Sequence, residues 1–179
     1  MKVLAIKSSP RIKGNTNSII DKIVQGAEES GHVIIPYNLN EMHVKGCQAC
    51  RTCKEKGVDC IIKDDLKDYW DKLKTADVLI MGSPVCMYTF CGPLKTFIDR
   101  HYCTKDKNMK SRLEPGKKVI MVYSQANSDE DAYKDNFNVL DQYFKTHKME
   151  VQTIVHCGHN HASENEELMQ MAYELGKSL

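Results

Sequence analysis

The segment KVLAIKSSPRIKGNTNSI, residues 2–19, passes from an apolar run to a polar stretch and then to a helical pattern. The apolar run Val3–Ile6 is typical of a buried strand, a polar stretch beginning at Ser8 interrupts it, and a helical pattern begins near Asn15. Free backbone N–H groups and the positive end of the helix dipole make such a helix start a ready site for an anion. The hydroxyl, amide and guanidinium donors around it suit a terminal phosphate with three acceptor oxygens.

The same loop is also compatible with a simpler interpretation, in which it joins a strand to a helix and binds nothing. It contains neither the GxGxxG of a dinucleotide-binding fold nor the GxxxxGK motif of a nucleotide triphosphatase. If the loop binds phosphate, side chains and a helix end provide the contacts.

The length and composition are those of an ordinary globular domain. The chain has 179 residues, of which 41% are hydrophobic and 27% charged, enough for a sizeable core. The formal net charge of +1 gives no electrostatic case for a nucleic acid or an anionic membrane as partner. No apolar run approaches the ~20 residues that span a bilayer. The first residues lack the basic and apolar regions of a signal peptide, so we expect a cytoplasmic location.

Strand and helix patterns alternate along the whole chain. Strands are expected at Val3–Ile6, Val33–Leu39, Ala76–Met81, Lys117–Tyr123 and Glu150–Val155, and helices at 15–30, 64–73, from Pro93, at 129–147 and at 163–175. Asp64 and Asp65 fit the N-cap and first turn of the second helix, and Ser163 with Glu166 fits a capping box for the last. The pattern predicts one three-layer α/β domain over 1–179, with a parallel sheet of order 2-1-3-4-5. Its ligand should lie beyond the carboxyl ends of strands one, three and four.

Two further loops would meet at that edge. The loop 82–92 after the third strand is unusually apolar and aromatic for a surface segment, and it should cover something flat. The loop after the fourth strand contains Ser124, Gln125 and Asn127, which can hydrogen-bond to the polar edge of a ring. The loops together suit a molecule with a phosphate at one end and a flat heteroaromatic system at the other.

SSPRIKGNTN (residues 8–17) followed by GSPVCMYTFCGPLKTFIDR (residues 82–100) resembles the flavodoxin-like NAD(P)H-dependent FMN reductases and the related iron–sulfur flavoproteins. The resemblance covers nearly the whole chain. It departs at Asn17, where relatives often have Ser, and at Cys86, where they often have an aromatic residue. It implies a flavodoxin-like, doubly wound fold and an FMN cofactor. The residues implied to bind FMN are Ser9, Arg11, Asn15, Thr16 and Asn17 at the phosphate, Pro84, Val85, Cys86, Met87 and Tyr88 around the isoalloxazine, and Ser124 and Gln125 at its far edge.

A cysteine-rich insertion occupies residues 46–63, between the second strand and the second helix. Its four thiols, Cys47, Cys50, Cys53 and Cys60, can converge on one centre and suit a 4Fe–4S cluster or zinc. The resemblance to iron–sulfur flavoproteins includes this location, although free or redox-active thiols remain an alternative. Cys103 and Cys157 are typical of small buried residues. The tract HCGHNH, residues 156–161, is either a metal-binding segment or a solvated loop.

The resemblance implies an oxidoreductase that moves electrons from NAD(P)H or a reduced carrier through FMN to an acceptor. Hydride transfer to a flavin requires no general acid or base, so no catalytic residue is assigned. Family members commonly build the FMN site at a subunit interface, which implies a homodimer or homotetramer. Two alternatives belong to other classes: a non-enzymatic FMN and 4Fe–4S electron-transfer module serving a ferredoxin-like partner, and a cysteine-based redox or metal sensor. NADH and NADPH are not separable here, because no adenosine-binding motif is visible.

Overall fold

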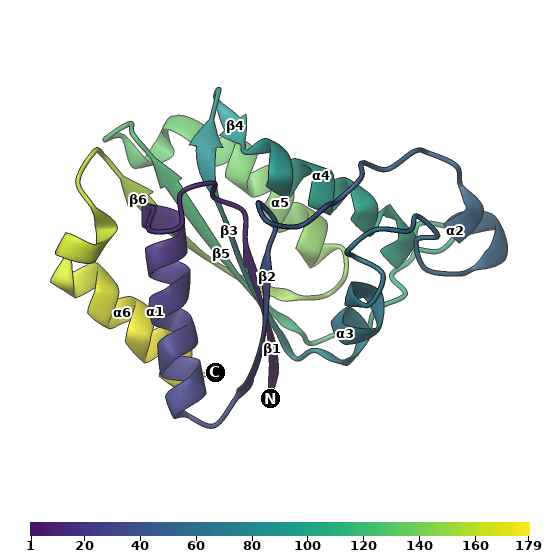
Figure 1. The fold of residues 1–179 in the computed structure, drawn as a ribbon, viewed down its shortest axis with the longest axis horizontal. Coiled ribbons are helices and arrows are strands. Elements are labelled where there is room, and N and C mark those ends of the chain that lie inside the picture. The colour runs from purple at the N-terminus through teal and green to yellow at the C-terminus, as the bar shows by residue number, and fades with distance from the viewer.

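Five parallel strands form the central sheet in the order β2-β1-β3-β5-β6 (Figure 1). The computed structural model that shows them describes residues 1–179. The strands are β1 Lys2–Lys7, β2 Val33–Asn38, β3 Val78–Cys86, β5 Lys118–Gln125 and β6 Glu150–Cys157. The predicted order 2-1-3-4-5 is thereby confirmed, since the two-residue β4, Thr89–Phe90, pairs only with β3 and lies outside the parallel path.

Helices cover both faces of the sheet, which makes three layers (Figure 1). They are α1 Asn15–Glu29, α2 Thr52–Lys56, α3 Tyr69–Thr75, α4 Gly92–Arg100, α5 Lys134–Lys145 and α6 Glu166–Lys177. Alternate residues of each strand point to opposite faces, so Val78 and Ile80 belong to the core beneath α1 and α6, while Leu79 and Met81 belong to the core beneath α3, α4 and α5. Because both faces are covered, the central strand β3 is apolar and buried without interruption over Val78–Met81, as predicted for a parallel strand.

Helix α1 lies unusually close to the sheet where it begins. A Cβ atom added to Gly82 would lie 2.5 Å from the Val122 carbonyl oxygen and 2.6 Å from Cγ2 of Thr16. Only a residue without a side chain fits between β3, β5 and the first turn of α1. This close approach brings the start of α1 to the carboxyl end of the sheet, where the candidate site lies.

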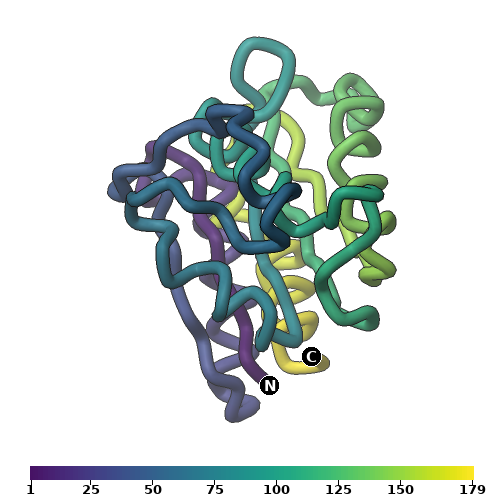
Figure 2. Tube along the Cα trace, turned by 90° about the vertical axis from the view of Figure 1, so that its right-hand side faces the viewer, coloured from purple at the N-terminus to yellow at the C-terminus, as the bar shows by residue number.

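The predicted loop 82–92 is in part a hairpin. Strand β3 continues five residues past the predicted end, to Cys86, and turns back through β4 before α4 begins at Gly92. Figure 2 shows this hairpin standing above the rest of the chain. Strand β3 is longer than predicted because β5, which is also longer than predicted, pairs with it as far as Pro84. The partner of Pro84 on β5 is Ser124.

The predicted helix start at Asp64 and Asp65 is wrong. Helix α3 begins at Tyr69, and residues 64–68 form turns. The Asp64 carboxylate is instead buried in an ion pair with Arg100, and its oxygens also accept the backbone N–H groups of Lys45 and Leu66. Asp65 accepts the backbone N–H of His43. Both carboxylates thus brace the irregular segment that carries the cysteines, where only α2 is regular.

Two other helix starts also differ from the predictions. The capping box at Ser163 is not formed: Ser163 lies in a short 3-10 turn, and Asn165 caps α6 by accepting the Leu168 N–H. The predicted helix 129–147 divides into a 3-10 turn, Glu130–Tyr133, and α5.

None of the helices is both long enough and apolar enough to cross a lipid bilayer.

Candidate functional site

A pocket of about 420 Å³ lies where the carboxyl ends of β1, β3, β5 and β6 meet, a size typical of small-molecule sites. Eight of the twelve residues expected to bind a cofactor line it: Ser9, Arg11, Asn15, Pro84, Val85, Cys86, Ser124 and Gln125. Thr16 and Asn17 are buried behind the pocket, and Met87 and Tyr88 project from the hairpin. The topology therefore places the three predicted loops around one cavity.

The β1–α1 loop presents donors at one end of this pocket. The Gly14 N–H donates to the Arg11 carbonyl over 2.9 Å, and the Arg11 N–H donates to Ser9 Oγ over 3.2 Å, which curls the loop tightly. The first helical hydrogen bond of α1 runs from Ser18 N–H to the Gly14 carbonyl, so the amides of residues 15–17 have no carbonyl one turn earlier to bind. These amides and the exposed Arg11 guanidinium form a concave, positive surface suited to an anion.

The side chains of the first turn of α1 are already engaged within the protein. Thr16 Oγ1 lies 2.6 Å from Ser124 Oγ, which joins α1 to the end of β5. Asn17 Nδ2 donates to the carbonyls of Arg11 and Ile12, which holds the loop in shape. Asn15 accepts the Ala162 N–H and donates to the Asn160 carbonyl. The contacts of these three side chains within the protein therefore shape the loop that borders the pocket.

The other end of the pocket is apolar and has one unsatisfied polar atom. Pro84, Val85 and Cys86 supply its wall at the end of β3, and burial raises the pKa of the Cys86 thiol. Gln125 Nε2 donates to the Asp129 carbonyl over 2.6 Å, and its Oε1 is buried without a partner. A buried acceptor without a donor is costly, and Asn17 Oδ1 at the opposite end is unpartnered in the same way.

The hairpin tip beside this wall is strained and exposed. Met87 and Tyr88 have positive φ angles of 46° and 69°, which side-chain-bearing residues rarely adopt. They are 88% and 73% exposed, although the Tyr88 carbonyl accepts a hydrogen bond of 2.7 Å from Asn136 Nδ2. The β3–β4 pairing holds the strained tip in place. Two large apolar side chains thus stand in solvent at the mouth of the pocket.

The β6 end contributes a wall that the sequence analysis missed. Gly158, His159 and His161 line the pocket, together with Lys13 from the β1–α1 loop. The signal that could have found them is the strand order, because the carboxyl end of the fifth strand lies beside that of the fourth.

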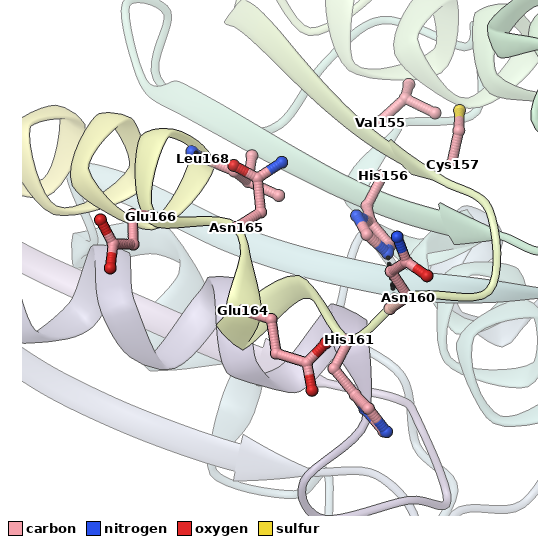
Figure 3. Close-up of a pocket in the computed structure, with 9 residues that line it drawn as sticks. All are labelled: Val155, His156, Cys157, Asn160, His161, Glu164, Asn165, Glu166 and Leu168. Atoms are coloured by element: carbon pink, nitrogen blue, oxygen red, sulfur yellow. Dashed lines mark hydrogen bonds between the residues drawn. The ribbon is translucent and has the colours of Figure 1, made fainter.

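The HCGHNH tract also borders a second, open pocket of about 770 Å³, shown in Figure 3. His156 Nε2 lies 3.0 Å from the Asn160 carbonyl oxygen, whereas His161 points away from it (Figure 3). No three His, Cys, Asp or Glu side chains of the chain are placed to hold a single metal ion. In this arrangement the tract forms a wall shared by two pockets.

The four cysteines of the insertion surround one small, apolar cavity of about 20 Å³, with Cys103 as a fifth thiol from the 3-10 turn after α4. Positive φ angles at Ala49 and Arg51 curl the segment around it. A hydrogen bond from the Thr52 backbone lowers the pKa of the Cys50 thiol, while burial raises that of Cys53 and brings that of Cys103 to about 12. The four predicted cysteines therefore line one cavity, although no three of them are placed to hold a single metal ion. Cys103 is the thiol that most resists ionisation.

The strand order and a ligand pocket at the carboxyl ends of the strands define a flavodoxin-like protein. The comparison with known protein families agrees with this class and identifies one family within it. The chain belongs to the NADPH-dependent FMN reductase family, whose model matches residues 1–160. The resemblance drawn from the two loops is thereby confirmed.

Individual relatives are similar over part of their length. An iron–sulfur flavoprotein from Methanosarcina thermophila is 30% identical over 116 residues, which are 65% of this chain and 60% of that protein. Another, from Methanocaldococcus jannaschii, is 36% identical over 100 residues, 56% of this chain and 51% of that protein. The chain thus matches little more than half the length of these relatives.

A solved structure shows the same fold over nearly the whole chain. The NAD(P)H:quinone oxidoreductase from Methanothermobacter marburgensis superposes with a TM-score of 0.77, covering 99% of this chain and 95% of that one. The sequence identity is 18%, so this likeness concerns the fold alone.

Proposed function

We propose that the chain binds FMN in the pocket at the carboxyl edge of the sheet and acts as an FMN-dependent oxidoreductase. The observation that carries this proposal is the polarity of the pocket. Free amides and Arg11 lie at one end, and the apolar wall of Pro84, Val85 and Cys86 lies at the other. A phosphate linked to a flat ring matches both ends. The family to which the chain belongs supports the same ligand.

The residues have distinct tasks in this proposal. Ser9, Arg11 and the amides of residues 15–17 would bind the phosphate, and Pro84, Val85 and Cys86 would pack against one ring face and exclude water from it. Bound FMN supplies the hydride and electron chemistry. Electrons would come from NAD(P)H or a reduced carrier and leave to an acceptor molecule. The solvent-exposed Met87 and Tyr88 would be covered by a second copy of the chain in a homodimer or homotetramer.

We further propose that Cys47, Cys50, Cys53 and Cys60 bind a 4Fe–4S cluster. Four thiols around one cavity are the donor set that such a cluster requires, and relatives named iron–sulfur flavoproteins support the assignment. Because the cavity is small, its exposed wall at Cys47 and Cys50 has to move outward for a group of that size. Cys103 comes from the 3-10 turn after α4 rather than from the insertion, and it stays outside the proposed ligand set.

An anaerobic absorption spectrum, with iron and acid-labile sulfide measured on the same sample, tests both proposals. Two flavin bands and about four irons and four sulfides per chain are expected, as a cubane held by four thiolates requires. The matched variants are Cys60→Ser, which should lose the iron, and Cys103→Ser, which should keep it.

The outcomes separate the functions. Flavin without iron would leave an FMN oxidoreductase with free thiols, and a protein that takes up no added FMN would overturn the main proposal. Zinc without flavin would favour a metal sensor. Oxidation of NADH or NADPH by the flavin-loaded protein would distinguish a reductase from an electron-transfer module that serves a ferredoxin-like partner.

A further inference from the structure

Arg100 is a fully buried cation beside the cysteine cavity. It ends α4, the helix that begins directly after the β3–β4 hairpin, and its side chain is 0% exposed. Its Nε–H donates to Cys60 Sγ over 3.2 Å, and its Nη1 donates to the Lys45 carbonyl over 2.7 Å. One guanidinium therefore joins the cysteine segment to α4.

Asp64 fixes the direction of this guanidinium. Both terminal nitrogens of Arg100 donate to the Asp64 carboxylate, whose side chain is also 0% exposed. The two oxygens of Asp64 accept in addition the backbone N–H groups of Lys45 and Leu66, so the carboxylate cannot rotate without losing bonds. Because the guanidinium is planar and both of its terminal nitrogens are held by Asp64, the direction of its Nε–H is fixed. This N–H points to Cys60 Sγ.

The neighbouring cations direct their donors elsewhere. Lys54, which is also buried, donates to the carbonyls of Tyr102 and Lys105, each over 2.6 Å. Arg112 donates to the carbonyls of Gly57, Val58 and Cys103. Of these three cations around the cysteine segment, Arg100 is the one that donates to a thiol sulfur.

We propose that Arg100 is a positioning residue that sets the reduction potential of the cluster held by the four cysteines, through its Nε–H bond to Cys60 Sγ. The inference rests on the proposed 4Fe–4S cluster. Uptake of one electron makes the cluster and its thiolates more negative, and a hydrogen bond to a sulfur stabilises that reduced form. Asp64 balances the charge of Arg100, so the hydrogen bond from Nε–H to Cys60 Sγ accounts for most of the effect on the reduction potential. Losing it should make the cluster harder to reduce.

The test is an anaerobic redox titration of the full chain containing FMN and cluster, with the reduced cluster followed by electron paramagnetic resonance. Arg100→Lys keeps a charge for Asp64 but has no Nε–H in a rigid fork. At the wild-type midpoint potential, the ratio of reduced to oxidised cluster should fall about tenfold, equivalent to about 59 mV for one electron. The control Arg112→Lys disturbs hydrogen bonds to the same segment without touching sulfur, and its ratio should stay within about twofold.

A second variant covers the case in which Arg100→Lys does not fold. The double variant Arg100→Gln with Asp64→Asn removes both charges together, so no buried charge is left unpaired. It too should hold four irons per chain and be harder to reduce. An unchanged midpoint in either iron-replete Arg100 variant would overturn the inference. Loss of iron from both variants, with iron retained in Arg112→Lys, would also overturn it, because Arg100 would then serve cluster loading. Wild-type protein without iron would reject the cluster itself, a result that the iron assay distinguishes.

Discussion

The hydroxyl oxygens of Thr16 and Ser124 lie 2.6 Å apart in a buried contact between the first turn of α1 and the end of β5. These residues are 108 positions apart in the chain, yet their bond fixes two of the loops that form the pocket relative to each other. Both were expected to contact the ligand directly. Their bond also holds the two loops together.

Replacing Thr16 by Val should destabilise the protein. Val preserves the shape but leaves the Ser124 hydroxyl buried without this partner, at a cost of about 1–2 kcal/mol in the free energy of unfolding. Urea denaturation of the FMN-free protein measures this, and Thr16→Ser, which keeps a hydroxyl, is the control. Equal midpoints for the Val variant and the wild type would show that the bond contributes nothing.

Replacing Arg11 by Ala should weaken FMN binding. Arg11 lines the phosphate end of the pocket with an exposed guanidinium, and a charge-assisted bond to phosphate contributes about 1.5–3 kcal/mol. The Kd for FMN, measured by quenching of flavin fluorescence, should therefore rise about tenfold to a hundredfold. Lys107→Ala removes an exposed positive charge outside the pocket and should leave the Kd unchanged. A similar loss of affinity in both variants would indicate a general charge effect.

The stability of the protein should fall as the pH drops from about 6.5 to 4. Burial lowers the pKa of His101 and of His147 to about 4, so both stay neutral in the fold while the unfolded chain takes up protons. The unfolded state binds more protons in this window, and each histidine adds a slope of about 1.4 kcal/mol per pH unit.

Urea unfolding of a His147→Gln variant across this pH range measures how much His147 contributes to the pH dependence of the free energy of unfolding. The variant should lose about half of the slope contributed by the two histidines. His43 is exposed, and His43→Gln should leave the slope as it is in the wild type. A His147→Gln slope equal to that of the wild type would contradict the assignment.

Replacing Gly176 by Ala should separate α1 from α6. A Cβ atom at Gly176 would lie 1.9 Å from the Ile23 carbonyl oxygen. That oxygen belongs to the backbone of α1, which cannot move aside as a flexible side chain could. We expect a loss of about 3 kcal/mol in the free energy of unfolding. Gly92→Ala is the matched control, because a Cβ there meets nothing within 4 Å. Thermal unfolding followed by circular dichroism compares the two, and equal stability would contradict the close packing.

The sequence predicted the sheet well because its signal is local. Apolar β-branched runs such as Val78–Met81 form strands, and alternation with helices leaves a parallel sheet as the economical arrangement. Strand ends were less predictable. Nothing within residues 82–86 indicates a strand. Strand β3 continues there because β5 offers hydrogen-bonding partners as far as Pro84, and β4 pairs with Val85 and Cys86.

The errors at charged and capping residues have a related cause. Asp64 fits a helix start by local rules, but in the structure its carboxylate is buried in an ion pair with Arg100, which comes from a distant helix. Asn165 replaces Ser163 as cap because a 3-10 turn intervenes, and the packing of that turn beneath α1 is not visible in the local sequence.

By itself, the sequence determined the kinds of donor available: a helix start with free amides and Arg11 for an anion, and four closely spaced cysteines for a metal group. These follow from residue type and spacing along a short stretch of chain. Only the tertiary structure decided that Thr16 bonds to Ser124, that β6 supplies a wall of the pocket, and that Arg100 reaches Cys60. Such contacts join residues far apart in the chain, and their geometry depends on the packing of whole elements rather than on local preference.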